Sequence, residues 1–348
     1  MDLVRIGIIG LGANTRLRHV PGLQACEGVE LTGVCNRRPE STNAAAREFD
    51  IPKTYDRWED LVADADIDAV VIGTWPYLHC PITLAALDAG KHVLTEARMA
   101  MNVAEAREML QASQSHPNLV TQIVPSPFGL RAGQTVKKLI ADGFLGELRE
   151  AVVVGTNNTV ADSKAPLHWR QVKEYSGLNM LVLGILHETL TRWIADPVRV
   201  LSQTHVFTPS RIDTATSKMA KVGTPDVVRV LTELPCGARG LYHLSGVMHH
   251  GPGMQIHLYG SEGTIKYQFT PEDRLYAATK DDSELTEVSV PPEQEGGWRV
   301  EEEFVNSIRG KEQVELTDFE TGVRYMEFTE GVAHSAEIRQ SVKLPISS

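Results

Sequence analysis

The sequence contains few cysteines and no long run of apolar residues. Only four of its 348 residues are cysteine, and none has the Cys-x-x-Cys spacing of metal or redox sites. We expect these residues, Cys26, Cys35, Cys80 and Cys236, to be reduced thiols in a cytoplasmic protein. No stretch approaches the roughly 18 consecutive apolar residues of a transmembrane helix, so we expect no membrane partner.

Positive charge is also scarce. Lysine and arginine number 34 against 45 aspartates and glutamates, which gives a formal net charge of −11. Domains that bind nucleic acid carry a basic face, and no large basic cluster is present here. We therefore expect no nucleic-acid partner. Four histidines between residues 243 and 257 lack a carboxylate at ligand spacing, so we expect no metal site.

The first third of the chain alternates strand-like and helix-like segments. The expected strands are residues 4–10, 29–35, 69–73, 92–95 and 119–124. The expected helices are residues 17–24, 40–49, 58–63, 81–89 and 103–113. Such alternation predicts a parallel sheet covered on both faces, and thus an α/β domain over residues 1–124.

The pattern changes after residue 124. A long apolar helix is expected over residues 178–194, followed by a run of strands and then by two helices. The expected strands are residues 199–207, 227–234, 238–245, 254–259 and 264–268, and the helices are residues 299–309 and 318–339. This order predicts a second, α+β domain over residues 125–348 with a mostly antiparallel sheet.

A glycine-rich segment lies between the first strand and the first helix. It reads Gly7-Ile8-Ile9-Gly10-Leu11-Gly12-Ala13-Asn14-Thr15, with threonine in place of the third glycine of G-x-G-x-x-G. Here glycine lets the backbone approach a pyrophosphate, while the helix N-terminus supplies N–H groups and a positive dipole. We expect Gly10, Gly12, Ala13, Asn14 and Thr15 to bind a dinucleotide. The alternative is a glycine turn without a ligand.

The second strand ends in a basic segment. NAD-selective sites usually place a carboxylate here to bond the ribose 2′-hydroxyl, but this chain has Asn36 followed by Arg37 and Arg38. Arginines bind a 2′-phosphate, which a carboxylate would repel. We expect all three residues to contact the cofactor, and we favour NADP over NAD. The alternative is that the arginines are solvated loop charges.

Motifs along nearly the whole chain carry a family resemblance. They are segments 19–23, 66–72, 74–79, 85–96, 143–147, 259–264 and 335–344, of which Ala85-Ala86-Leu87-Asp88-Ala89-Gly90-Lys91-His92-Val93-Leu94-Thr95-Glu96 is the most specific. The chain resembles the Gfo/Idh/MocA oxidoreductases, relatives of glucose–fructose oxidoreductase and inositol dehydrogenase.

This resemblance implies an N-terminal Rossmann domain that binds NAD(P), and a C-terminal domain with an open, mostly antiparallel sheet. It implies an active site between the domains, and homodimers or homotetramers that pack through the sheet. We also expect Thr74, Trp75, His79 and Glu96 to contact the cofactor.

The catalytic positions depart from the family. Its Glu-Lys-Pro motif reads Glu96-Ala97-Arg98 here, and its Asp-x-x-x-His motif aligns with Val182 and Leu186. Alcohol oxidation needs a general base, and arginine stays protonated. We therefore predict His187 as the base, and Glu188 as a group that orients His187 or binds sugar hydroxyls. The alternative is that both lie on another face of the helix and only pack or are solvated. Arg98 is predicted to polarise a carbonyl or bind a carboxylate. Trp169, Arg170 and Tyr175 are predicted to bind substrate.

These features support three functions. The first is an NADP-preferring oxidoreductase acting on a small polyol, sugar, hydroxy acid or cyclic aldehyde. The second is a redox-assisted lyase, glycosidase or epimerase that retains its nicotinamide through each turnover. The third is a non-catalytic subunit that binds a nucleotide or sugar, which the missing lysine, aspartate and histidine motivate.

Overall fold

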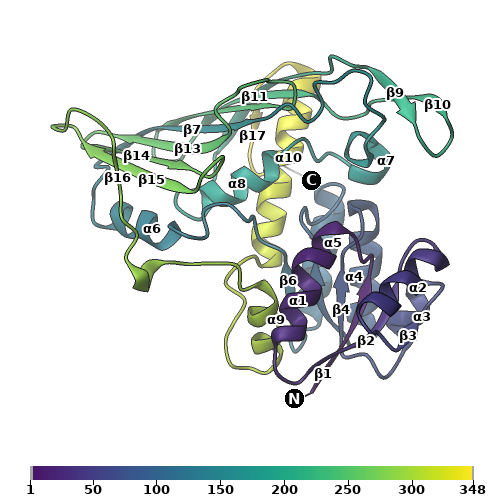
Figure 1. Cartoon of the computed structure of the whole chain (residues 1–348). Helices are drawn as coiled ribbons and strands as arrows, with labels where there is room; N and C mark the ends of the chain where they lie inside the picture. The colour runs from purple at the N-terminus through teal and green to yellow at the C-terminus, as the bar shows by residue number, and fades with distance from the viewer. Residues whose placement is uncertain (1–2, 347–348) are drawn as a thin grey trace. The chain divides into compact units, whose positions relative to one another are not determined.

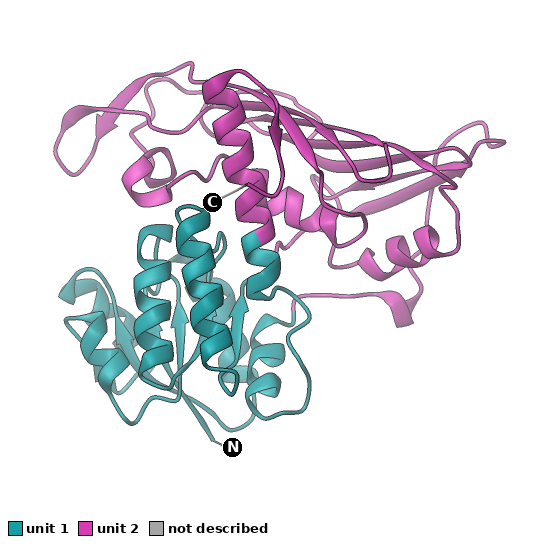
Figure 2. Cartoon of the chain, turned by 180° about the vertical axis from the view of Figure 1, so that it is seen from behind, with its two compact units in different colours: residues 1–125, 299–323 teal, residues 126–298, 324–348 magenta. Residues whose placement is uncertain are grey.

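The chain forms two compact units (Figure 2). The computed structural model describes residues 3–346. Unit 1 consists of residues 1–125 and 299–323, and unit 2 of residues 126–298 and 324–348. No helix in the described part of the chain is long and apolar enough to cross a membrane.

Unit 1 contains a six-stranded sheet in the order β3-β2-β1-β4-β5-β6, and all its strand pairs are parallel (Figure 1). The strands are β1 (Val4–Ile9), β2 (Val29–Cys35), β3 (Lys53–Thr54), β4 (Ala69–Ile72), β5 (His92–Thr95) and β6 (Thr121–Ile123). The helices are η1 (Thr15–His19), α1 (Val20–Ala25), α2 (Pro39–Glu48), α3 (Trp58–Ala63), η2 (Pro76–Leu78), α4 (His79–Asp88), α5 (Val103–Ser115) and α9 (Val300–Ile308). This strand order is that of the Rossmann fold, as predicted.

The central strands are apolar because both faces of the sheet are covered. Every residue of β4 is buried, and so are five of the six residues of β1. A strand buried on both faces has no polar side to show to water. This explains why the strands of unit 1 were recognisable as continuous apolar runs.

A late segment of the chain completes unit 1. The sequence pattern predicted residues 299–323 to belong to the second domain, but in the structure they cluster with the first. Ile123 at the end of β6 exchanges backbone hydrogen bonds with Thr317, and the Gln122 amide donates to Glu303 and to the Leu316 carbonyl. These contacts join segments far apart in sequence, so local patterns did not reveal them.

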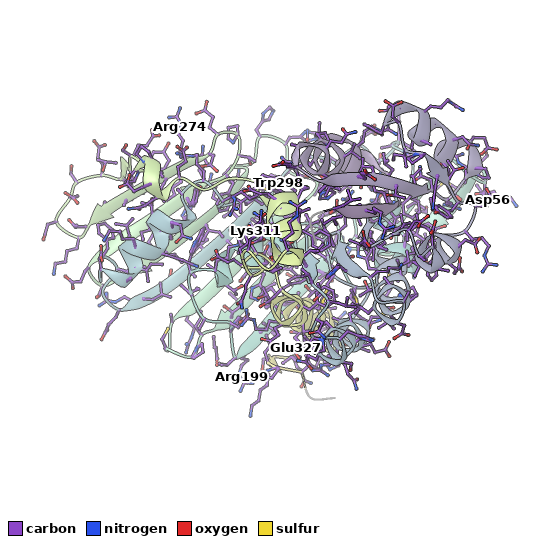
Figure 3. All side chains as sticks on the ribbon, turned by 90° about the horizontal axis from the view of Figure 1, so that it is seen from below. Asp56, Arg199, Arg274, Trp298, Lys311 and Glu327 are labelled. Atoms are coloured by element: carbon purple, nitrogen blue, oxygen red, sulfur yellow. The ribbon has the colours of Figure 1, made fainter. Side chains whose placement is uncertain are left out.

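Unit 2 contains a nine-stranded sheet in the order β16-β15-β14-β13-β7-β12-β11-β8-β17. All neighbours are antiparallel except β7 and β12, which confirms the mostly antiparallel prediction. The strands are β7 (Leu148–Thr156), β8 (Arg199–His205), β11 (Val227–Glu233), β12 (Arg239–Ser245), β13 (Met254–Gly260), β14 (Gly263–Gln268), β15 (Arg274–Thr279), β16 (Thr286–Glu287) and β17 (Val342–Lys343). A separate hairpin consists of β9 (Ser210–Asp213) and β10 (Lys218–Lys221). Figure 3 labels Arg199 of β8 and Arg274 of β15, which begin strands near opposite edges of the large sheet.

Helices pack on one face of this sheet. The remaining helices of the chain are α6 (Gly133–Ala141), η3 (Trp169–Gln171), α7 (Lys173–Ser176), α8 (Leu183–Thr191), η4 (Pro292–Gln294) and α10 (Phe319–Ile338). Helices α6, α8 and the later part of α10 share a buried apolar core with the sheet (Figure 1). Leu186 of α8 and Phe328 of α10 are buried in this core.

The apolar helix before β8 is shorter than predicted. The apolar pattern predicted a helix over residues 178–194, but α8 spans only Leu183–Thr191. Gly177 and Leu181 have φ angles of +64° and +45°, which a right-handed helix does not contain. The apolar pattern continues through this turn because the turn is itself packed in the core, so hydrophobicity alone overstated the helix.

Candidate functional site

The glycine segment forms a tight turn at the carboxyl end of β1. Gly10 has a φ of +87°, and a Cβ atom there would lie 2.7 Å from the backbone nitrogen of Thr74. Only glycine satisfies both conditions without strain. The turn therefore packs against the end of β4, where a Rossmann domain holds its pyrophosphate.

Gly12 differs from Gly10 because nothing in the protein fills the space beside it. A Cβ atom at Gly12 would have its nearest contact, the Gly73 carbonyl oxygen, at 3.8 Å. The glycine is not needed for packing, and its open side fits a loop that a pyrophosphate approaches closely. The residues present at this loop thus fit a dinucleotide.

Thr15 stands in place of the third glycine, and its side chain fits inside the protein. Its side chain is buried, and its hydroxyl donates to the Gly10 carbonyl over 3.3 Å. Gly73 makes room, because a Cβ atom there would clash with the Thr15 hydroxyl. A glycine directly after β4 thus compensates for the glycine missing from the motif, and Thr15 supports the loop through its hydrogen bond to Gly10.

Asn36 connects the glycine loop to α2. Its side-chain oxygen accepts from the Leu11 backbone N–H over 2.7 Å, and its amide donates to the Ser41 carbonyl. Both ends of the amide are thus bonded to protein. The adjacent Arg37 and Arg38 are exposed, and the Arg37 guanidinium lies 5.8 Å from the centre of the Trp75 ring. A cation and an aromatic face therefore lie together beside the loop.

His79 links two segments of unit 1 and has no ring nitrogen left for a cofactor. It is fully buried, with Nδ1 3.0 Å from the Arg98 carbonyl oxygen and Nε2 3.0 Å from the Thr74 carbonyl oxygen. This placement argues against the direct cofactor contact that the sequence suggested. His79 instead positions Thr74 and Arg98, whose own side chain is also buried.

Glu96 belongs to a charged cluster that sequence reasoning missed. One carboxylate oxygen lies 3.1 Å from His19 Nε2 and 2.5 Å from the Asn14 amide nitrogen. The other ring nitrogen of His19 lies 2.5 Å from a carboxylate oxygen of Glu301. Asn14 and Glu96 were predicted as cofactor residues, and the structure brings them together. His19 lay in a family motif, but no local signal pointed to Glu301, 282 residues away.

The predicted substrate residues of unit 2 lie in one short stretch. Trp169 and Arg170 are part of η3, and Tyr175 follows in α7. His168 begins η3, because its Nδ1 accepts from the Arg170 N–H over 3.2 Å. The Arg170 guanidinium lies 4.3 Å from the centre of the Trp169 ring. This stretch presents a cation on an aromatic face, an arrangement that suits a sugar-like or anionic ligand.

The structure argues against His187 as the general base. Its ring is fully buried, with Nδ1 2.8 Å from the Tyr242 hydroxyl and Nε2 3.2 Å from Asp196. The ring also stacks on Phe328 at 3.6 Å between centroids. Burial lowers the pKa of His187, against the opposing effect of Asp196. Both nitrogens are bonded within unit 2, so the ring serves packing.

Glu188 is held in an ion pair rather than oriented toward His187. Its carboxylate accepts from the Arg192 guanidinium over 2.8 Å and from the Ser126 backbone N–H over 2.7 Å. Arg192 also donates to the Phe128 and Ser126 carbonyls. Both side chains are nearly inaccessible, 4% exposed for Glu188 and 8% for Arg192. The pair anchors the start of unit 2 to α8, which contradicts the predicted partnership with His187.

Val182 and Leu186 stand where the family has its aspartate and histidine, and their apolar side chains pack in the core of unit 2. Both pack over Gly155 of β7, where a Cβ atom would lie 2.8 Å from each side chain. No titratable group stands at either of these two positions. Within residues 3–346, no group of three or more His, Cys, Asp or Glu side chains is arranged to hold a metal ion.

Comparison with known proteins identifies the family of this chain. Residues 4–123 match the profile described as "Oxidoreductase family, NAD-binding Rossmann fold", and residues 134–266 match the GFO/IDH/MocA C-terminal domain. The fold and the glycine loop thus define an oxidoreductase with an NAD-binding Rossmann domain. The chain belongs to the Gfo/Idh/MocA family, and it is an enzyme of that family.

Named relatives are dehydrogenases. Trans-1,2-dihydrobenzene-1,2-diol dehydrogenase of Sus scrofa is 28% identical, over 70% of this chain and 67% of its own length. Levoglucosan dehydrogenase of Pseudarthrobacter phenanthrenivorans is 24% identical, over 72% of this chain and 67% of its own. A levoglucosan dehydrogenase structure in complex with NADH and L-sorbose has a TM-score of 0.88 at 22% identity, with complete coverage of both chains. At that identity the structural match shows the shared fold.

Proposed function

We propose that this enzyme transfers a hydride between a nicotinamide cofactor, preferably NADP, and a small polyol, sugar, hydroxy acid or cyclic aldehyde. The observation that carries the proposal is the glycine loop, in which Gly12 leaves open space where a pyrophosphate would lie. The relatives support the substrate class, because they are named for levoglucosan and for a dihydrodiol.

The preference for NADP rests on charge at the end of β2. Arg37 and Arg38 are exposed cations, the Arg37 guanidinium lies near the Trp75 ring, and Asn36 puts no carboxylate at that point. A 2′-phosphate gains charge-assisted hydrogen bonds from arginine, whereas a ribose diol gains little from it. Both cofactors occur among proteins of this fold: one structural neighbour is titled in complex with NADH, and another as a putative NADPH-dependent oxidoreductase.

A nucleotide titration tests this preference. We expect NADP⁺ and NADPH to raise the melting temperature of the native chain more than NAD⁺ and NADH do. The double variant Arg37→Ala, Arg38→Ala should weaken NADP⁺ about 100-fold and change NAD⁺ by less than about twofold, because it removes charge-assisted bonds to the 2′-phosphate only. Arg47→Ala, in the last turn of α2, is the control. Equal loss of both nucleotides would contradict the assignment.

In this proposal, residues of unit 1 bind the cofactor, and residues of unit 2 bind the substrate and exchange a proton with it. When bound, the cofactor accepts or donates the hydride. In unit 1, the glycine loop, Asn14, Thr15 and Glu96 would hold it. In unit 2, Trp169 and Arg170 would bind the substrate, and the Tyr175 hydroxyl would exchange a proton with it.

A second function has a specific observation in its favour. Ala97, Val182 and Leu186 leave the family's proton-transfer positions apolar. An enzyme that retains its nicotinamide and works as a lyase, glycosidase or epimerase returns the hydride in each turnover. A panel of sugars and polyols with the preferred nucleotide distinguishes the two. Stoichiometric free NADPH supports the dehydrogenase, whereas substrate loss without net reduction, with nucleotide co-purified, supports the second function.

Assembly through the large sheet of unit 2 is part of the proposal. Leu201, Leu231 and Leu241 are directly opposite one another on β8, β11 and β12, and they are 42%, 56% and 40% exposed. A continuous apolar row of this kind marks an interaction face. We expect a homodimer or homotetramer by light scattering, and dissociation by Leu231→Glu. Leu285→Glu, at a similarly exposed leucine outside the row, should leave the mass unchanged.

A further inference from the structure

His19 is a buried ring held between two carboxylates of unit 1. It ends η1 and has no exposed surface. Its Nδ1 lies 2.5 Å from Glu301 of α9, and its Nε2 lies 3.1 Å from Glu96, which follows β5. The fold makes room for this arrangement, because a Cβ atom at Gly22 would lie 2.7 Å from the Glu301 carboxylate.

The two carboxylates decide the charge of the ring. A neutral imidazole has a hydrogen on one nitrogen only, so it cannot donate to both Glu96 and Glu301. Burial by itself lowers the pKa of His19, but the hydrogen bonds and charges of Glu301 and Glu96 raise it to about 9. The ring is therefore an imidazolium at neutral pH, and it compensates half of the negative charge that the two carboxylates bring into the interior.

Glu96 connects His19 to the glycine loop through contacts with both His19 and Asn14. The carboxylate oxygen that faces His19 also accepts from the Asn14 side chain, and the second oxygen accepts from the Ala97 backbone N–H over 3.2 Å. One carboxylate thus ties the glycine loop to the Glu96-Ala97-Arg98 turn. In Rossmann domains these are the ends of β1 and β5, where the cofactor binds.

We propose that His19 is a positioning residue, which holds Glu96 and Asn14 in the geometry that binds the nucleotide and is itself anchored by Glu301. This inference rests on the proposed function, because it assigns His19 to the same cofactor site. His19 touches no cofactor atom in this account. It acts through Glu96, and the cationic form of its ring is required.

Nucleotide affinity is the first test. His19→Gln and Glu301→Gln should each raise the dissociation constant for NADP⁺ about tenfold, equivalent to about 1.4 kcal/mol. His116→Gln, at a partly exposed histidine that ends α5, is the matched control and should keep the native affinity. Native affinity in His19→Gln would overturn the inference.

The pH profile separates positioning from a merely structural role. A folded-state pKa raised to about 9 means that the stabilising contribution of His19 is complete below the unfolded value of 6.5 and is lost as pH rises through about 9. The nucleotide affinity of the native chain should fall as pH rises through about 9, where the folded ring loses its proton, and that of His19→Gln should not. The charged or titratable groups around the ring include Glu96 and Glu301, with His79 near Glu96 and Cys26 near Glu301. These groups are common to both proteins, so the comparison isolates His19.

The charge of the ring can be measured without any nucleotide. Nitrogen-15 NMR of the native full chain should show both ring nitrogens of His19 protonated at pH 8, and a neutral ring would overturn the inference. If the native chain binds none of the four nucleotides, the proposed function fails. If the native chain binds NADP⁺ and His19→Gln binds it equally well, the inference alone fails.

Discussion

Replacing Gly12 with valine is expected to abolish nucleotide binding and to leave the fold intact. The closest contact of a Cβ atom at this position is the Gly73 carbonyl oxygen at 3.8 Å, so the first carbon of the new side chain makes only an ordinary contact. It would occupy the space that the proposed pyrophosphate needs. We expect the dissociation constant for NADP⁺ to rise at least about 100-fold, equivalent to about 2.7 kcal/mol. Calorimetric titration measures the affinity, and thermal unfolding without ligand checks the fold.

Two other glycines provide the controls for this result. Gly297→Val, at another position where a Cβ atom meets nothing within 4 Å, should keep both stability and affinity. Gly10→Val should instead destabilise the unliganded protein, because its φ is +87° and its Cβ atom would lie 2.7 Å from the Thr74 nitrogen. Native affinity in Gly12→Val would place the nucleotide somewhere other than this loop.

Replacing Glu188 with alanine is expected to destabilise the protein strongly. The Arg192 guanidinium is only 8% exposed and would lose its carboxylate. Removing one partner of a buried ion pair costs about 3–5 kcal/mol, because the other charge stays buried without compensation. Denaturant unfolding of the native chain and of the variant measures this loss.

A double variant distinguishes a structural role from a catalytic one. Glu188→Met with Arg192→Met removes both charges, and much of the lost unfolding free energy should return. If Glu188 only anchors the start of unit 2, the double variant should also regain turnover. A Glu188→Gln enzyme with native stability and no turnover would restore the catalytic role that the sequence suggested.

The sequence predicted the architecture well because the relevant signals are local. Continuous apolar runs such as Ala69–Ile72 identified the buried strands, and Gly10 with Gly12 marked the turn after the first strand. The helix over residues 178–194 was overstated, since burial made a turn look like part of a helix. The place of residues 299–323 in unit 1 depends on contacts with Gln122 and Ile123, and no local pattern encodes such contacts.

The candidate site was predicted in part. Asn14 with Glu96, and Arg37 with Trp75, were selected from the sequence and do lie together in unit 1. His187 was selected because it is adjacent to a motif position, yet one residue along a helix turns a side chain by about 100°. That rotation places its ring against Phe328 and Tyr242 in the core. A motif gives the position of a residue in the helix, but tertiary packing decides which way its side chain points.

The sequence by itself determined the class of protein, the alternation of strands and helices in unit 1, and the position of the glycine loop after the first strand. The hydrophobic period, the turn glycines and the family motifs are patterns of nearby residues, so they can be recognised without knowing the tertiary structure. Only the tertiary structure decided which histidine carries charge. His19 and His187 are both fully buried, but His19 lies between two carboxylates and His187 between a phenol and one carboxylate. The pKa of His19 is accordingly raised and that of His187 is lowered, because a buried ring takes its charge from partners that the fold brings to it.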